Sequence, residues 1–193
     1  KLTDTQTVPL ETGQTVITGL TDTSQLIPGM EASAAVGIVA GTKIWRILSA
    51  TSLQLDEAVT VTAPAVAVTF KVPASTNVDL FAYRSGSTAK LEMVLWTDAV
   101  TRATALTLSN GVYRKSSDKT RLYVGSVRTV AAGQTEDSIS RRFVWNMYHR
   151  QPRGLRVIDT SDAWAYDDNA WRAANGSTAN RVELLIGPSE NPV

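Results

Sequence analysis

A cluster of aromatic and acidic residues lies near the C-terminal end of this sequence. Trp164, Tyr166 and Trp171 are interleaved there with Asp167 and Asp168. Aromatic rings pack against the apolar faces of sugars, and carboxylates accept hydrogen bonds from hydroxyl groups. The pattern therefore indicates a glycan or receptor contact. The alternative is a solvated loop whose aromatic side chains anchor it to the core.

A second candidate is the arginine-rich stretch RRFVWNMYHRQPR, residues 141–153. Arginine binds phosphate and aromatic rings stack on bases, so this composition is compatible with nucleic acid. The same composition is typical of subunit interfaces, where planar guanidinium groups form paired hydrogen bonds. A net charge of +1 gives the whole chain no general attraction to nucleic acid. We therefore predict no nucleic-acid partner and a subunit interface formed by Arg142, Trp145, Tyr148, Arg150 and Arg153.

The other reactive residue types do not form a catalytic pattern. His149 is the only histidine, and no nucleophile-elbow motif accompanies it. The absence of cysteine excludes thiol nucleophiles, cysteine-ligated zinc and iron–sulfur clusters. Residues 167–169 lack the alternating acidic spacing of a calcium loop, and the scattered glycines form no phosphate loop. We therefore expect no catalytic residue, no metal, no cofactor and no enzymatic activity.

The composition predicts a β-rich globular fold. The chain of 193 residues is 43% hydrophobic and 19% charged, which is typical of a folded protein. Its apolar residues lean towards Val, Ala, Leu and Ile, and Thr is abundant, which favours pleated surfaces. We expect no membrane insertion, because no stretch approaches about 18 apolar residues and no signal sequence opens the chain. Because the first residue is Lys1, we expect a processed or trimmed piece.

Turn signals divide the chain into three parts. Residues 1–12 are polar and lack a strong period, which predicts an N-terminal arm or linker. Residues 13–71 alternate short apolar segments with turns, which predicts a small β module. Pro64 in the last of these segments indicates a strand boundary, an edge or a bulge. Further strands predict a β-sandwich domain over residues 72–193.

Two hairpins are expected in the second domain. Residues 78–83 and 89–96 flank a short turn that contains glycine. Residues 105–108 and 112–114 flank the pair Asn110-Gly111, which adopts positive φ at little cost. The second pattern is the strongest local hairpin signal in the chain.

Residues 137–150 support two interpretations. Ile139, Phe143 and Met147 lie four residues apart, which favours a helix. Phe143, Trp145 and Met147 alternate, which favours a strand. We favour a short helical turn leading into a long strand, and the helix stays the alternative.

Residues 120–129 and 181–186 predict two more strands, the first with an interruption at Gly125. Together these segments reach the seven or so strands that a sandwich needs. The predicted fold is therefore all-β, a small β module followed by a larger β-sandwich, for which a jelly roll is one topology. Trp96 and Trp145 are expected in the core.

The chain also carries two longer patterns. The first consists of four elements in order, Val16-Ile17-Thr18-Gly19-Leu20, Leu26-Ile27-Pro28-Gly29-Met30, Gly37-Ile38-Val39-Ala40-Gly41-Thr42-Lys43-Ile44 and Ser49-Ala50-Thr51-Ser52-Leu53-Gln54-Leu55. Their order and spacing resemble a β module that recurs in phage tail and fibre proteins and in bacterial surface repeats. The second part of the chain resembles, more loosely, a domain of tailed-phage virion proteins, through Phe81-Ala82-Tyr83, Leu91-Glu92 with Trp96, Leu106-Thr107-Leu108 with Asn110-Gly111-Val112, Tyr123-Val124-Gly125 and RRFVWNMYHRQPR.

The resemblance implies a structural component of a tailed-phage particle. Such a protein decorates the head or forms part of a fibre or tail appendage, and can contact the host surface. The resemblance also implies a homotrimer in the virion, assembled in the host bacterial cytoplasm, with other virion proteins and host surface polysaccharide as partners. It carries no functional residue onto this chain. The alternative function is a carbohydrate-binding module with an aromatic platform around Trp164 and Trp171.

Overall fold

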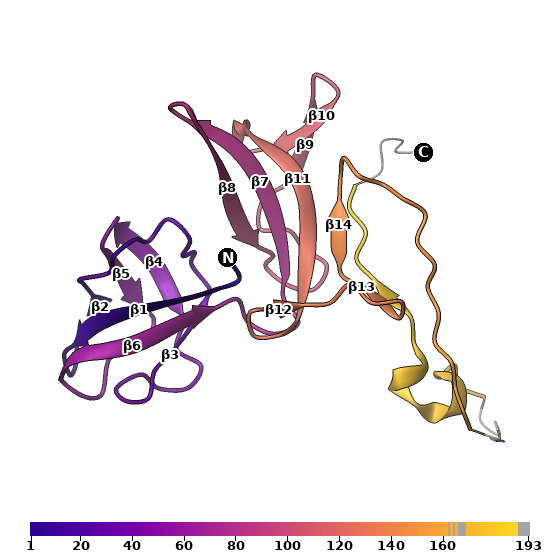
Figure 1. The fold of residues 1–193 in the computed structure, drawn as a ribbon, viewed down its shortest axis with the longest axis horizontal. Helices are drawn as coiled ribbons and strands as arrows, with labels where there is room; N and C mark the ends of the chain where they lie inside the picture. Colours follow the sequence, from indigo (N-terminus) through magenta and orange to yellow (C-terminus); the bar gives the residue numbers. More distant parts are fainter. Residues whose placement is uncertain (162, 164, 166–168, 189–193) are drawn as a thin grey trace.

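The computed structural model describes residues 1–161, 163, 165 and 169–188. In this part the chain is all-β apart from two short 3-10 helices, η1 (Ala174–Gly176) and η2 (Thr178–Asn180). Figure 1 shows a small β module at one end, a larger sheet in the middle and an extended excursion at the other end. The predicted fold class is confirmed, whereas the jelly roll stays a prediction. No helix of the described part is long and apolar enough to cross a membrane.

Two three-stranded antiparallel sheets build the first module. One contains, in spatial order, β1 (Thr3–Leu10), β6 (Ala63–Lys71) and β3 (Glu31–Ser33), and the other contains β2 (Val16–Ile17), β5 (Ser52–Leu55) and β4 (Ile44–Ser49). A β-bridge between Glu31 and Lys43 joins the two sheets. On β6 the alternate residues Val66, Val68 and Phe70 are buried, as the period of two requires.

Strand β1 corrects the expectation that residues 1–12 form an arm or linker. It pairs with β6 along its length, and its Val8 is buried in the module core. The preceding inward position holds Gln6, whose amide oxygen accepts a hydrogen bond from the Thr21 amide (2.8 Å) and whose Nε2 donates to the Asp22 carbonyl (2.6 Å). Because this buried position holds a hydrogen-bonded polar side chain instead of an apolar one, the sequence of β1 lacks the alternating apolar pattern of a strand.

Pro64 lies in β6, the central strand of its sheet. The register of β1 and β6 shifts between the pairs Val8–Val66 and Leu10–Ala63. This bulge accommodates a residue that has no N–H to donate to the ladder. Of the three predicted roles for Pro64, the bulge is therefore confirmed.

A larger antiparallel sheet follows the first module. Its spatial order is β8 (Thr88–Leu95), β7 (Asn77–Ser85), β11 (Asp118–Ala131), β10 (Val112–Lys115) and β9 (Leu106–Ser109), with β12 (Gln134–Thr135) and β14 (Val144–Asn146) also paired to β11. Both predicted hairpins, β7–β8 and β9–β10, are confirmed. In the second hairpin Asn110 and Gly111 have φ values of 53° and 75°, the left-handed conformation that the pair predicts.

Gly125 does not interrupt β11, whose register against β7 shifts between Tyr123 and Gly125. At this point β14 pairs with β11 in antiparallel orientation. A Cβ atom on Gly125 would lie 2.1 Å from the carbonyl oxygen of Trp145. Glycine is therefore required here by the approach of a second backbone.

The segment 137–150 forms neither the helix nor the long strand that its sequence predicts. It contains two short strands, β13 (Arg141–Arg142) and β14, and no helical turn. Phe143 and Met147 are buried and Trp145 is half-buried, so the alternation is correct over the central residues alone. Strand β15 (Glu183–Leu184) pairs in parallel with β13, and the predicted strand 181–186 is reduced to these two residues.

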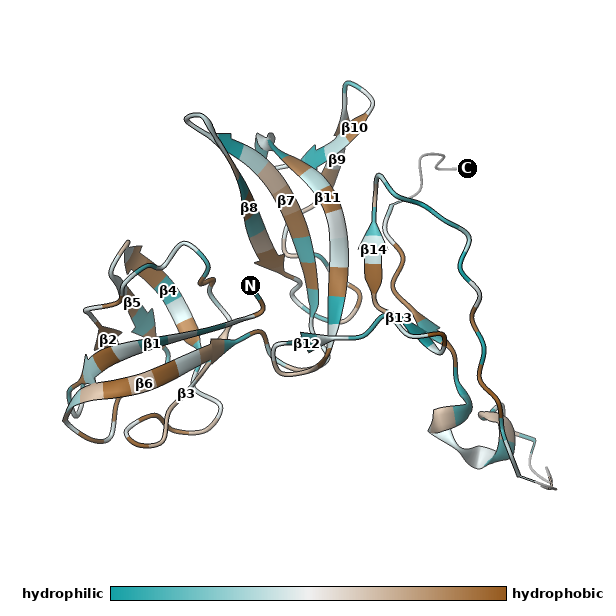
Figure 2. Cartoon of the chain, in the orientation of Figure 1, coloured by the Kyte–Doolittle hydropathy of each residue, from teal (hydrophilic) through white to brown (hydrophobic). Residues whose placement is uncertain are grey.

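One face of the larger sheet shares its core with the first module. Val78 and Val127 of the sheet belong to the same apolar cluster as Val72, at the junction, and the interior of the first module. The opposite face has a smaller cluster around Phe81 and Tyr123. The two parts are therefore joined by packing as well as by the chain. Figure 2 shows brown, apolar residues recurring along the strands of both parts.

Candidate functional site

The predicted glycan-contact residues are only partly described. Trp164, Tyr166, Asp167 and Asp168 lie outside the described residues. Trp171 lies within them, and its side chain is fully exposed (101%). An aromatic side chain in this state contributes no packing to the core, so for Trp171 the anchoring alternative is wrong.

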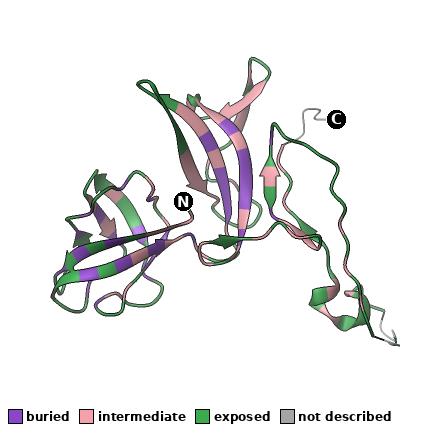
Figure 3. Cartoon of the chain, viewed as in Figure 1, coloured by how far each residue is buried: buried purple, intermediate pink, exposed green. Residues whose placement is uncertain are grey.

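Trp171 belongs to an extended excursion, residues 150–188, which we call the C-terminal arm. The arm leaves the larger sheet after β14, passes through η1 and η2 at its tip and returns through β15 (Figure 1). None of its described residues is buried (Figure 3). A segment with so little burial does not recover the entropy cost of its own ordering.

Hydrogen bonds around Asp159 hold the tip of the arm together. Its carboxylate accepts hydrogen bonds from the Ser161 hydroxyl (2.6 Å) and from Asn180 Nδ2 (2.5 Å). These bonds, those from Ser161 above all, lower the pKa of Asp159 below its ordinary value. Asp159 is therefore held as an anion that ties the outgoing limb of the arm to the returning limb.

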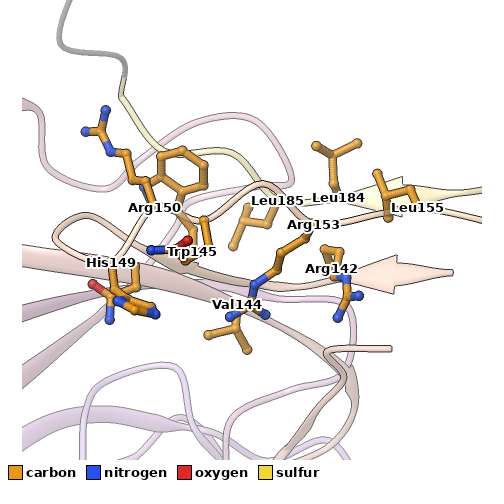
Figure 4. A pocket seen from close by; sticks show the side chains of 11 residues that line it. Arg142, Val144, Trp145, His149, Arg150, Arg153, Leu155, Leu184 and Leu185 are labelled. Carbon is orange, nitrogen blue, oxygen red and sulfur yellow. The ribbon is translucent and has the colours of Figure 1, made fainter. Parts of the chain in front are cut away.

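A hollow of about 290 Å³ lies at the base of the arm, and we call it the arm hollow. Figure 4 shows the side chains of β14, the outgoing limb and the returning limb converging on it. Its apolar part is formed by Val144, Trp145, Leu155, Leu184 and Leu185, and its charged part by Arg142, Arg150 and Arg153. Four of the five predicted interface residues therefore line one hollow, whereas Tyr148 does not line it and is 55% exposed.

Two arginines of the arm hollow are paired within the chain. Arg142 and Arg153 both form ion pairs with Asp137, and Arg142 also donates to the Asp137 carbonyl (3.1 Å). Arg141 beside them pairs with Glu136 and with Glu183 of β15. A surface that binds phosphates needs cations that are not already neutralised. The pairing therefore favours a protein contact over a nucleic-acid contact.

Trp145 is fixed between the arm and the sheet. The backbone of Gly187 lies so close to its indole that a Cβ atom there would be 2.0 Å from Nε1. The Arg150 guanidinium lies 5.5 Å from the ring centroid, a cation–π contact. Trp145 is half-buried rather than buried, and so is Trp96, whose ring lies beneath Arg102 at 4.3 Å. In both cases an arginine covers part of the ring that the core was expected to cover.

A buried polar cluster on the larger sheet escapes prediction from the sequence. Asp79 accepts two hydrogen bonds, from Ser126 Oγ to Oδ1 (2.6 Å) and from Arg102 Nε to Oδ2 (3.0 Å). The Tyr123 hydroxyl oxygen lies 2.6 Å from Ser126 Oγ. Because Ser126 gives its proton to Asp79, the Tyr123 hydroxyl donates to Ser126. Burial raises the pKa of Asp79 and the pKa of Tyr123 above their ordinary values.

This cluster contains the residue types of a proton relay, but a substrate has no access to them. Asp79, Ser126 and Tyr123 are at most 1% exposed. Arg102, from the loop between β8 and β9, covers the carboxylate. The cluster therefore fastens this loop to the sheet and supports the fold. Its only sequence signal is the charged Asp79 within the apolar run VDLF.

A second ionic cluster joins four neighbouring strands of the same sheet. Glu92 on β8 receives Lys115 Nζ of β10 (2.5 Å) and Arg121 Nε of β11 (2.7 Å). The Arg121 guanidinium lies 3.8 Å from the ring centroid of Tyr83 on β7. These contacts join the four strands at their distal ends, and all of the charges are paired with one another.

His149 is exposed at the edge of the arm hollow, and among the described residues no carboxylate or hydroxyl is hydrogen-bonded to its imidazole. Within the described residues no three His, Cys, Asp or Glu side chains are grouped closely enough to hold a metal ion. The described side chains of the arm hollow form an aromatic and apolar surface with arginines beside it. No protein-family model, no curated protein and no solved structure matches this chain.

Proposed function

We propose that this chain is a structural component of a tailed-phage particle, decorating the head or forming part of a fibre or tail appendage. The support for the phage assignment is the four-element pattern over residues 16–55. The observation that carries the assembly role is that none of the described residues of the C-terminal arm is buried. Ordering such a segment is offset when its exposed apolar side chains are covered by a partner.

The assembly that we propose is a homotrimer, with the arm hollow and Tyr148 at the contact between subunits. The apolar lining of the hollow and its arginines have the composition of interface cores. Closed threefold symmetry would use one such surface in every copy without open-ended growth. Arg142 and Arg153 already share Asp137, so they would present to the neighbour an ion-pair cluster with a net charge of +1 rather than two free cations.

Purified phage particles test the proposed location. Antibodies raised against the chain should label one type of structure on the particle in electron microscopy, and mass spectrometry of the particles should find the chain. Washed particles that lack the chain would refute the assignment. Light scattering of the purified chain tests the trimer separately, because it depends on mass alone.

A carbohydrate-binding module is the second candidate, and one observation favours it. Trp171 presents its whole side chain to solvent, as a sugar platform does. Titration with bacterial surface polysaccharides tests this function through tryptophan fluorescence. Binding that is lost in Trp171→Ala but retained in Trp45→Ala, an exposed tryptophan outside the arm, would support it. No binding by the parent chain to any polysaccharide of the host would exclude it.

A further inference from the structure

The outgoing limb of the C-terminal arm is a stretch of extended backbone between β14 and the tip (Figure 1). Residues 149–158 contain no helix or strand, and none of them has a positive φ. Among the described residues, one amide of this stretch is hydrogen-bonded to other backbone, that of Arg156 to the Ile139 carbonyl (2.9 Å). Exposed segments held by so few contacts are preferred sites of proteolytic cleavage.

The basic residues decide where an arginine-specific protease can act on this chain. There are 19 of them, and most lie within strands, whose backbone is held by ladder hydrogen bonds. Outside the strands, contacts hold the side chain or backbone of Lys1, Lys43, Arg102, Arg150, Arg153 and Arg172. Within the described part of the chain, the side chains of Arg156 and Arg181 form no such contact, and both residues are exposed.

The backbone around Arg181 is held in place on both sides. Arg181 follows η2 directly, and Asn180 Nδ2 before it donates to the Asp159 carboxylate (2.5 Å) and the Ala174 carbonyl (2.9 Å). Two residues after Arg181, the Glu183 amide is already hydrogen-bonded to β13. A protease would have to break these contacts to bind the segment in extended form.

The backbone around Arg156 needs much less rearrangement. Arg156 lies within the extended stretch, and Ile158 after it is 64% exposed. A trypsin-like protease selects arginine through its specificity pocket, and a guanidinium forms paired hydrogen bonds with a carboxylate. The Arg156 guanidinium is available for such a pocket once the single bond to Ile139 is released.

We propose that the Arg156–Val157 peptide bond is a processing site for an arginine-specific serine protease. The protease hydrolyses this bond, so that water is added across it. The products are a carboxylate at Arg156 and an amino group at Val157. The inference goes beyond the proposed function and does not depend on a phage particle or on a trimer.

Cleavage at this bond releases the rest of the arm. The amides of Glu183 and Leu185 donate to the carbonyls of Ser140 and Arg142 (3.0 and 2.8 Å), and the Glu183 carboxylate pairs with Arg141 (3.3 Å). No described residue after Arg156 is buried. A separate fragment loses translational and rotational freedom when it keeps these contacts, whereas the intact chain does not.

Release of the fragment also opens the arm hollow. Leu184 and Leu185 leave with it, and so does Gly187, whose backbone covers the Trp145 indole. Val144 and Trp145 of β14 then gain exposure to solvent. Processing therefore uncovers an apolar surface that the intact chain covers in part.

Limited digestion of the full-length chain with trypsin, followed by mass spectrometry, tests the cleavage site. The first products should be residues 1–156 and 157–193. Arg156→Gln should slow the first cleavage by about fivefold, because Arg153 on the same limb is held in an ion pair with Asp137. Arg181→Gln is the matched control, and it should keep the parent rate and products. A first cleavage at another bond, or an unchanged rate in Arg156→Gln, would overturn the inference.

Size-exclusion chromatography of the cleaved chain under native conditions tests the release. The fragment 157–193 should elute apart from residues 1–156, and the latter should bind more of the apolar dye ANS than the intact chain does. Co-elution of the two fragments, or equal dye binding, would overturn the release and the opening of the hollow.

Discussion

Replacing Asp79 by alanine should be among the most destabilising single changes in the larger sheet. Asp79 is 1% exposed and accepts hydrogen bonds from Ser126 Oγ and Arg102 Nε. Alanine would leave the Arg102 guanidinium and the Ser126 hydroxyl without their acceptor. Ser126 keeps its contact with Tyr123 at 2.6 Å, so it is only partly orphaned.

The magnitude follows from these contacts. Removing one partner of a buried ion pair costs about 3–5 kcal/mol, and a hydrogen bond to a charged group contributes about 1.5–3 kcal/mol. Arg102 is 24% exposed and can be rehydrated, and the cost of burying the carboxylate is relieved, so the lower end applies. We expect a loss of about 3 kcal/mol. For a chain of 193 residues this corresponds to a decrease of about 6–12 °C in Tm.

Urea denaturation followed by circular dichroism measures this loss. The matched control is Glu57→Ala, which removes an exposed acid of the first module and should leave the midpoint close to the parent value. A loss below about 1 kcal/mol in Asp79→Ala, or one equal to that of the control, would refute the reasoning. It would mean that the cluster contributes no more than surface polar groups.

Three further outcomes are expected. Burial raises the pKa of Asp79 above 3.8, so the folded chain holds the Asp79 proton up to a higher pH than the unfolded chain does. The contribution of Asp79 to the free energy of unfolding therefore falls as the pH rises from 3.8 through the raised pKa. Asp79→Asn should remove this slope from the curve of stability against pH. Gly125→Ala should cost about 2 kcal/mol or more in chemical denaturation, since its Cβ meets the Trp145 carbonyl oxygen, whereas Gly154→Ala, with no atom within 4 Å, should be neutral or slightly stabilising. Gly111→Ala should cost about 1–2 kcal/mol in the same assay, because its φ of 75° is left-handed, and an unchanged midpoint would contradict the turn geometry.

The elements that the sequence predicts correctly are those specified by neighbouring residues. Asn110-Gly111 determines its hairpin through two backbone conformations, and both strands follow directly. Pro64 predicts a strand boundary, an edge or a bulge, because the missing N–H is a property of that residue alone, and the structure shows the bulge. Such signals do not depend on the rest of the chain.

The elements that the sequence misses depend on distant partners. β1 is hidden because Gln6 occupies an inward position that only the backbone of residues 21–22 makes acceptable. Segment 137–150 pairs with β11 on one side and with β15, some forty residues later, on the other. The ambiguity of its apolar spacing is resolved by that tertiary pairing rather than by local propensity.

In the candidate site, too, the part specified by neighbouring residues is predicted and the part that depends on distant residues is missed. The composition of residues 141–153 predicts a contact surface, and the structure collects four of the five predicted residues in the arm hollow. Leu155, Leu184 and Leu185 complete the hollow, and no spacing rule connects them with Trp145. They are brought together by the return of the arm, which only the fold determines.

Because the arm side chains are exposed in the single chain, their variants can change association without changing the stability of the fold. Leu184 is 54% exposed in the single chain, so Leu184→Glu removes little buried area from it. Phe143, in the adjacent β13–β14 segment, is 5% exposed, and a charge there would enter the core and unfold the sheet. A Leu184 variant that loses association but keeps the parent unfolding curve would therefore report on the contact alone. The same loss of association in a Phe143 variant would report on the fold. Leu184 on the returning limb, rather than Phe143 in the arginine-rich segment, is therefore the informative position at which to test assembly.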